Sequence, residues 1–297
     1  MSASRVDPAA LTARRIREPG AVAQAWADRA PARRPADGRL LLIAADHPAR
    51  GALGVRADAR AMASRTDLLG RLEAALARPG VDGVLGTPDI LEDLLLAGLL
   101  DGRVVIGSMN RGGLQGASFE LDDRFTAYDA ATITRFGLDG GKMLTRVCLE
   151  DPGTASTLEA SGQAVGHLAA AQKMAMVEPF LSVRRDGRVV NLLDPDSVIR
   201  SIHVVAGLGP TSAFTWLKLP VVDDMQRVLD ATTLPTLLLG GDPTGDPDET
   251  YLTWQQALTC PAAAGLVVGR SLLYPADDDV AAAVDTAAAL VHGGRHD

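Results

Sequence analysis

Residues 235–269 read PTLLLGGDPTGDPDETYLTWQQALTCPAAAGLVVG. An aliphatic run at 235–240 is followed by a polar loop, a helical pattern at 247–259 and a second aliphatic run at 264–269. Short, continuously apolar runs are typical of parallel strands, because helices cover both faces of a parallel sheet. This stretch therefore predicts a strand–helix–strand unit with parallel strands.

The same alternation recurs along the chain from residue 39 onward. The expected strands are 39–46, 82–87, 103–109, 138–147, 176–183, 213–219, 235–240 and 264–269. The expected helices are 58–78, one that begins at Pro88, 123–137, 154–173, 194–207, 222–231, 247–259 and 277–291. Eight strand-then-helix units predict an α/β fold, and specifically a closed (β/α)8 TIM barrel.

A doubly wound sheet is the competing architecture. Such sheets that bind dinucleotides carry a G-x-G-x-x-G loop after the first strand, where this chain has Asp46-His47-Pro48. The barrel is therefore favoured. We expect residues 1–38, which are rich in Ala, Arg and Pro, to form an N-terminal helical extension, and residues 39–297 to form one barrel domain.

Composition excludes several classes of partner. The net charge of −8 and the pI of about 5.2 leave no basic surface that would favour nucleic acid or an anionic membrane. No apolar stretch of about 18 residues could span a bilayer, and the N-terminus lacks the apolar core of a secretory signal. The two cysteines, Cys148 and Cys260, are expected to be buried free thiols. A cytoplasmic protein is the resulting expectation.

Lysine is scarce among the 29 basic residues: only Lys142, Lys173 and Lys218 occur. Lys142 and Lys218 both lie in apolar, strand-like segments. Arginine keeps its proton in proteins, whereas a desolvated lysine can become a neutral nucleophile. On the sixth expected strand, Trp216 and Lys218 share one face and the leucines between and after them take the other. This pattern makes amine chemistry inside the barrel the leading hypothesis.

Further polar residues lie near the carboxyl ends of the expected strands, where barrel enzymes carry their sites. They are Asp46, Asn110, Arg111, Lys142, Glu178 and Lys218. Each also has a structural interpretation, since an aspartate can cap a turn and a lysine can extend to the barrel rim. Convergence of carboxylates and lysines on one barrel mouth is costly to desolvate, and it favours function.

The last two strands end in glycine. Gly240-Gly241 and Gly269-Arg270 occupy the positions at which many barrels bind phosphate through backbone N–H groups. Glycine lets the backbone approach an oxyanion, and Arg270 would add a charge-assisted contact. Ordinary turn glycines are the alternative interpretation.

These segments together resemble class I, Schiff-base aldolases of the deoxyribose-phosphate and tagatose/fructose-bisphosphate aldolase group, including aldolase-like barrel proteins of inositol breakdown. The similarity extends from about residue 39 to 275 and keeps the order of the motifs. The segments that carry it are Ala45-Asp46-His47, Asp139-Gly140-Gly141-Lys142-Met143-Leu144, Val177-Glu178-Pro179, Trp216-Leu217-Lys218-Leu219-Pro220, Gly240-Gly241 and Val268-Gly269-Arg270.

The resemblance implies reversible aldol cleavage through an imine on Lys218. Lys142 would tune this nucleophile, while Glu178 and Asp46 would move protons in an order that the sequence leaves open. We expect substrate or phosphate contacts from six residues: Gly240, Gly241, Gly269, Arg270, His47 and Asn110. The imine serves as the electron sink, so neither a metal nor another cofactor is expected.

Three alternatives stay open at this point. A metal-dependent class II aldolase would need strand-end histidines that the chain lacks. Another imine-forming barrel enzyme, of the dehydratase or transaldolase type, would use the same lysine. A non-catalytic regulator that binds sugar phosphate would keep the pocket without forming an imine. The expected substrate is a phosphorylated ketose, a keto-sugar acid or a related carbonyl compound, and the expected assembly is a homo-oligomer.

Overall fold

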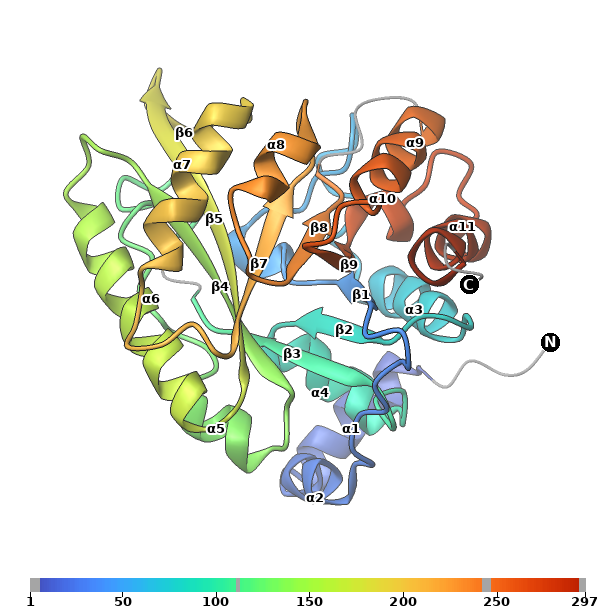
Figure 1. The fold of residues 1–297 in the computed structure, drawn as a ribbon. Coiled ribbons are helices and arrows are strands. Elements are labelled where there is room, and N and C mark those ends of the chain that lie inside the picture. Colours follow the sequence, from blue (N-terminus) through green and yellow to red (C-terminus); the bar gives the residue numbers. More distant parts are fainter. Residues whose placement is uncertain (1–5, 111–112, 242–246, 294–297) are drawn as a thin grey trace.

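Eight parallel strands close into a barrel in the computed structural model, which describes residues 6–110, 113–241 and 247–293 (Figure 1). The strands follow one another in the order β4-β3-β2-β1-β9-β8-β7-β5, and pairing of β4 with β5 closes the circle. Their bounds are β1 Leu40–Ala44, β2 Gly83–Gly86, β3 Val104–Ser108, β4 Gly140–Val147, β5 Met174–Arg185, β7 Thr215–Pro220, β8 Thr236–Leu239 and β9 Ala263–Val268. The predicted (β/α)8 fold is confirmed.

Helices surround the barrel and follow each of the eight strands in turn. They are α3 Arg65–Leu76, α4 Pro88–Leu96, α5 Ala130–Arg135, α6 Gly153–Ala170, α7 Pro195–Ala206, α8 Met225–Asp230, α9 Pro247–Ala257 and α11 Val280–His292. Two of them, α3 and α5, each begin seven residues later than the sequence pattern predicts, at 65 rather than 58 and at 130 rather than 123. Ser64 Oγ accepts from the backbone N–H of Asp67, and the side chain of Asp129 accepts from that of Thr132, so these N-caps set the starts of α3 and α5.

Two apolar cores lie on the two sides of the strands. An inner cluster fills the barrel and includes Leu42, Ile106 and Leu237, while a larger outer cluster packs the strands against the helices. Strand β7 contributes to both: Leu217 and Leu219 belong to the outer cluster and Trp216 packs against the inner one. The alternation expected for this strand is therefore present, and it directs Lys218 toward the barrel axis.

Two helices precede the first strand, α1 Pro8–Arg17 and α2 Ala21–Asp28. The ring of Trp26 stacks on Phe136 at a centroid distance of 5.5 Å. Arg29 donates to the carbonyl oxygens of Arg103, at 3.0 Å, and of Gly137, at 2.6 Å, which precede β3 and β4. The extension thus packs at the amino ends of the strands, and Figure 1 shows it at the lower edge of the barrel.

Three short elements were not predicted. Strand β6 Arg188–Asn191 pairs antiparallel with β5, which runs on to Arg185, so a hairpin stands where only a loop was expected between the strand and the next helix. The 3-10 helix η1 Pro48–Arg50 follows β1, and α10 Arg270–Leu273 follows β9. All three lie at the carboxyl ends of barrel strands.

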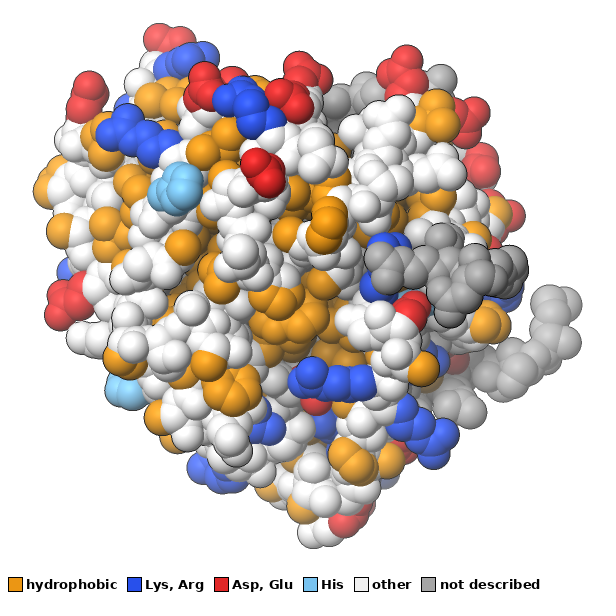
Figure 2. Space-filling view, in the orientation of Figure 1, with side chains coloured by type: hydrophobic (Ala, Val, Ile, Leu, Met, Phe, Trp, Pro, Cys, Tyr) orange, Lys and Arg blue, Asp and Glu red, His pale blue; other side chains and the backbone are white. Residues whose placement is uncertain are grey.

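The charge on the surface is mixed. On the face drawn in Figure 2, basic and acidic side chains are interspersed among apolar ones, without a broad basic patch among the described residues. Within the described ranges, no helix is both long enough and apolar enough to cross a membrane.

Candidate active site

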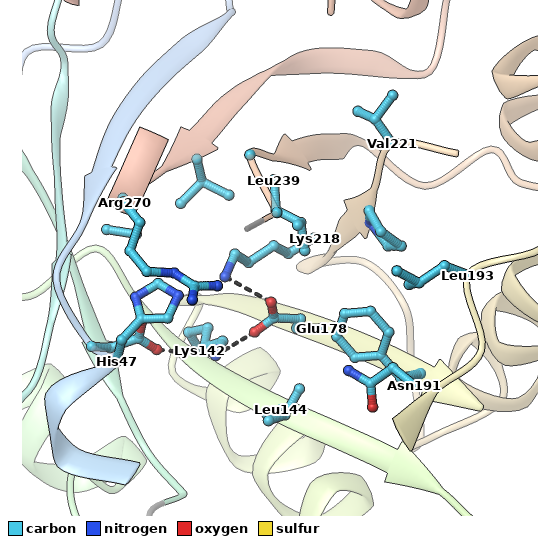
Figure 3. A pocket seen from close by; sticks show the side chains of 18 of the residues that line it. His47, Lys142, Leu144, Glu178, Asn191, Leu193, Lys218, Val221, Leu239 and Arg270 are labelled. Atoms are coloured by element: carbon cyan, nitrogen blue, oxygen red, sulfur yellow. Dashed lines mark hydrogen bonds and ion pairs between the residues drawn. The ribbon is translucent and has the colours of Figure 1, made fainter. Parts of the chain in front are cut away.

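A cavity of about 450 Å³ opens at the carboxyl ends of the barrel strands (Figure 3). Its wall takes residues from six strands or the loops after them: β1, β4, β5, β7, β8 and β9. All four residues expected to be catalytic, Asp46, Lys142, Glu178 and Lys218, line it.

Lys218 lies near the end of β7 with only 3% of its surface exposed. Its Nζ donates a hydrogen bond of 2.8 Å to Oε1 of Glu178 on β5, the neighbouring strand. Burial of an ammonium group is costly unless it is paired, and Glu178 supplies the pairing.

The Glu178 carboxylate bridges two ammonium groups. Its second oxygen, Oε2, forms an ion pair with Nζ of Lys142, which lies on β4. Nζ of Lys142 also contacts Oδ2 of Asp46 at 3.0 Å. The result is a buried row of alternating charge, Lys218–Glu178–Lys142–Asp46, whose members come from four different segments of the chain (Figure 3).

The two lysines determine the ionisation of Glu178. Burial acts to raise the pKa of this carboxyl group, but the positive charges of Lys142 and Lys218 outweigh it and lower the pKa to about 2. Glu178 is therefore an anion in the resting site near neutral pH. It is also the one carboxylate of the row that contacts both lysines.

His47 lies beside Asp46 at the rim of this row (Figure 3). Burial lowers the pKa of its imidazole to about 3, and the charges of Arg270 and Lys218 act in the same direction, against the attraction of Asp46. The ring is therefore neutral at pH 7. Its Nδ1 lies 3.8 Å from Oδ1 of Asp46, which is too long for a hydrogen bond. A neutral ring at the cavity wall can accept or donate a hydrogen bond without adding charge.

The four residues expected at the phosphate end also line the cavity: Gly240, Gly241, Gly269 and Arg270. A Cβ at position 269 would lie 2.4 Å from the carbonyl oxygen of Ala44, so only glycine fits between β9 and the end of β1. Gly241 has a φ of +66°, in the left-handed region that favours glycine. Both glycines bring bare backbone to the cavity that Arg270 also lines.

Asn110 lies apart from this set. Its Nδ2 donates to the carbonyl oxygen of Leu144 at 2.6 Å, and its Oδ1 accepts from the backbone N–H of Leu144 at 2.9 Å. The side chain is buried between β3 and β4 and does not line the cavity. We therefore reassign Asn110 from substrate contact to support of β4. Arg111 lies outside the described residues. Trp216, on the same face of β7 as Lys218, packs against the inner cluster and is not part of the cavity wall.

Several residues of the wall were not singled out from the sequence. Arg146 continues the inward face of β4 beyond Lys142 and Leu144, at a spacing of two residues, so strand periodicity alone could have found it. Arg50 comes from η1. Phe180, Asn191 and Leu193 come from the β5–β6 hairpin and the segment after it. In the described part of the chain, no three His, Cys, Asp or Glu side chains are grouped as metal ligands.

Residues 38–288 match the family model described as Cgl0159-like. The crystal structure of Cgl0159 from Corynebacterium glutamicum is 54% identical in sequence, and it superimposes with a TM-score of 0.94 over 97% of this chain and 98% of that one. The search of curated proteins finds no match.

More distant structures share the fold alone. An archaeal fructose 1,6-bisphosphate aldolase is 17% identical, with a TM-score of 0.62 over 92% of this chain and all of that one. Another archaeal fructose-1,6-bisphosphate aldolase, solved with its catalytic Lys covalently bound to the carbinolamine intermediate of the substrate, is 17% identical. Its TM-score is 0.63 over 91% of this chain and 99% of that one.

Proposed function

The chain belongs to the Cgl0159-like family, and we propose that it is a class I aldolase, a lyase that cleaves or forms a carbon–carbon bond through an imine on Lys218. The proposed substrate is a phosphorylated ketose or keto-sugar acid. One observation carries the proposal. Lys218 is a buried amine at the carboxyl end of a barrel strand, and a carboxylate 2.8 Å away can take its proton.

The first step is loss of a proton from the Lys218 ammonium group. Glu178 is its hydrogen-bond partner and accepts this proton. The free electron pair on Nζ then bonds to the carbonyl carbon of the substrate. The nitrogen then loses a proton and the carbonyl oxygen takes one up, which gives a carbinolamine. A further proton on that oxygen lets it leave as water, and the iminium ion remains.

The second step breaks the carbon–carbon bond. A base removes the proton from the hydroxyl group on the carbon that will become the aldehyde, and the electrons of the breaking bond move toward the iminium nitrogen to form an enamine. We assign Glu178 to carbinolamine formation, because it contacts Lys218, and Asp46 to the hydroxyl proton. Protonation of the enamine carbon and hydrolysis of the imine then restore Lys218.

Lys142 organises the two carboxylates. It contacts both Glu178 and Asp46, and its charge keeps Glu178 ionised between turnovers. At the other side of the cavity, Gly269 and Arg270 would hold a phosphate group of the substrate. The shared fold supports the proposed imine on Lys218, because an aldolase with the same barrel has been solved with its catalytic lysine covalently bound to the carbinolamine intermediate.

The cytoplasm is the compartment that we propose for this reaction, because both cysteines, Cys148 and Cys260, are free and buried. We further propose a homo-oligomer. Exposed apolar side chains such as Leu149 and Leu252, at 69% and 56%, offer contacts for a second copy. Light scattering coupled to size-exclusion chromatography tests the assembly, and a monomeric mass would contradict it.

Borohydride reduction followed by intact-protein mass spectrometry tests the reaction. The wild-type protein, incubated with dihydroxyacetone phosphate and a panel of ketoses and aldehydes, should gain the mass of one reduced ligand. Lys218→Ala should gain none, whereas the control Lys173→Ala, which lacks a lysine outside the cavity, should behave as wild type. Measurable binding of these ligands without any adduct in the wild type would point to a regulator instead. Product analysis separates an aldolase from a dehydratase or transaldolase.

A further inference from the structure

Two further arginines line the wall of the cavity. Arg146 lies on β4 and Arg50 in η1, and both take part in the wall of the cavity that holds Lys218. Strand β4 is four strands from β9 in either direction around the barrel. Arg146 therefore lies across the barrel mouth from Arg270, with the reactive lysine between the two sides.

Both guanidinium groups are held by hydrogen bonds to residues that do not line the cavity. Nη1 of Arg146 donates to Oε1 of Glu120 at 2.5 Å, and Nη2 donates to the carbonyl oxygen of Glu120 at 2.7 Å. Arg50 donates to the carbonyl oxygens of Gly113 and Asn110 at 2.7 and 3.1 Å, and it pairs with Asp123. These contacts hold the loop after β3 against the barrel mouth, which is a structural role.

After these structural contacts, Arg50 and Arg146 still have N–H donors that are not used in a hydrogen bond within the described part of the chain. Each guanidinium carries five N–H donors. Arg146 uses two and Arg50 uses three in the hydrogen bonds above, so three and two donors remain within the described part of the chain. The Nε atoms of both residues are among these, and they are buried without a hydrogen-bond partner there. The other remaining donors are on the Nη atoms, two on Arg146 and one on Arg50.

The positive charges of Arg50 and Arg146 also favour an anion on the cavity side. Burial lowers the pKa of Arg146, and the positive charge of Arg50 lowers it further, so the two cations repel each other across a poorly solvated space. Glu120 and Asp123 neutralise them from the side away from the cavity only. An anion on the cavity side would relieve the repulsion and use the free donors.

We propose that Arg50 and Arg146 form a second oxyanion subsite, so that the substrate carries an anionic group, phosphate or carboxylate, at each end and its reactive carbonyl between them. The inference rests on the proposed function for the position of the carbonyl at Lys218. Arg146 is four residues beyond Lys142 on β4, a rise of about 13 Å, which suits a chain of several carbons. Leu144 lines the wall between the two levels, and Phe180 lies in register with Arg146.

Carbonyl-free probes test the subsite independently of imine formation. Titration calorimetry would compare alkyl monophosphates with α,ω-alkanediol bisphosphates and ω-phosphoalkanoates of four to eight carbons. The best bisphosphate or phosphoalkanoate should bind wild type about 10 to 100 times more tightly than the matching monophosphate. Preference between the two dianionic series identifies the second group as phosphate or carboxylate.

Substitutions test whether the preference for probes with two anionic groups depends on these arginines. Arg146→Met combined with Glu120→Leu removes the ion pair without leaving a buried charge, and it should reduce the preference to less than about threefold while monophosphate binding persists. Arg146→Lys keeps a charge but loses the fork, and it should give an intermediate value. The control Arg184→Met removes an arginine that also binds a carboxylate and a carbonyl, those of Asp151 and Ser118, outside the cavity.

Equal binding of mono- and dianionic probes by wild type would overturn the subsite. A preference that survives in the folded Arg146→Met/Glu120→Leu variant would overturn its assignment to Arg146. These outcomes are distinct from failure of the proposed function, which appears only in borohydride trapping. A protein that forms no adduct can still show the dianion preference, and an active imine enzyme can lack it.

Discussion

At the scale of single residues, Glu178 is central because one buried carboxylate serves two ammonium groups. Its two oxygens contact Lys218 and Lys142 separately, so the charges of both lysines act on the same carboxylate. The low pKa of Glu178, about 2, describes the resting state in which both lysines are charged. Loss of one of those charges weakens the cause of the shift, and this is how the same group can first stabilise Lys218 and then accept its proton.

Glu178→Gln tests this role. Glutamine keeps the shape and a hydrogen-bond acceptor but cannot take a proton from Lys218, so the rate of imine formation should fall about 100-fold or more. The rate is measured by quenching with borohydride at successive times. Circular dichroism and a thermal melt confirm that the variant is folded. An unchanged rate in a folded variant would show that the proton leaves Lys218 by another route.

The residues of this row could be predicted because each stands at a strand end in a segment that is otherwise apolar. Their partners could not. The sequence left open which carboxylate contacts Lys218, and only the pairing of β5 with β7 places Glu178 there. The periodicity of β7 predicts that Trp216 shares a face with Lys218, but only the packed structure shows that Trp216 contacts the inner cluster and not the cavity.

At the scale of elements, the loop from β9 into α10 depends on a bare backbone. Gly269→Ala would place a Cβ 2.4 Å from the carbonyl oxygen of Ala44, so β1 and β9 must move apart at the cavity. We expect a loss of about 1–3 kcal/mol of stability and weaker binding of dihydroxyacetone phosphate, measured by denaturation and by calorimetry. The control Gly70→Ala, in open space on α3, should instead stabilise the protein by up to about 1 kcal/mol. Unchanged affinity in Gly269→Ala would contradict the role of this loop.

Helix α11 is fastened to the amino ends of the strands by a charged histidine. Nδ1 of His292 lies 2.7 Å from Oδ2 of Asp37, and Nε2 lies 3.2 Å from Oδ2 of Asp82 and 3.1 Å from the carbonyl oxygen of Gly80. The hydrogen bond to Asp82, followed by that to Asp37, raises the pKa of His292 to about 9, against partial burial.

The stability from this contact should depend on pH. Because the pKa in the folded state exceeds the value of about 6.5 in the unfolded chain, the contribution is complete below pH 6.5 and is lost as pH rises through 9. We expect His292→Gln to lower the free energy of unfolding by about 1–2 kcal/mol at pH 6, after allowance for solvent screening, and by much less at pH 10. Denaturation series at both pH values measure this. An equal loss at both would contradict the assignment.

The β5–β6 hairpin has a turn signal in the sequence that lies beyond the expected end of the strand. Its turn contains Asp186 and Gly187, both with positive φ, of 50° and 76°. Asp-Gly is a strong hairpin signal between strand-forming residues. The expected strand ended at Val183 because the run of apolar residues ended there, and the turn signal begins three residues later. The hairpin matters for the site because Asn191 lies on it and lines the cavity.

At the scale of the whole molecule, the barrel could be predicted because its strands are buried on both faces and read as apolar runs at regular intervals. Closure of the circle, through pairing of β4 with β5, has no local signal and follows only from the number of units. The loops at the carboxyl ends were the least predictable part. Their structure depends on long-range contacts such as those of Arg50 with Asn110 and Gly113.

The N-terminal helices contribute stability at the end of the barrel opposite the cavity. Trp26 is 3% exposed and stacks on Phe136. Trp26→Ala should therefore lower the free energy of unfolding by about 3 kcal/mol and leave imine trapping unchanged, measured by denaturation and by borohydride reduction. Loss of trapping in a folded Trp26→Ala protein would mean that the extension also acts on the site.

The central claim is that Lys218 is the nucleophile, and the position of the reduced adduct tests it most directly. The chain has only three lysines, so protease digestion and tandem mass spectrometry of the borohydride-treated protein can assign the adduct to one of them. We expect all of the ligand mass on the peptide that contains Lys218, with Lys142 and Lys173 unmodified. An adduct on Lys142 would reverse the roles of the two buried lysines, and no adduct on either would contradict an imine mechanism.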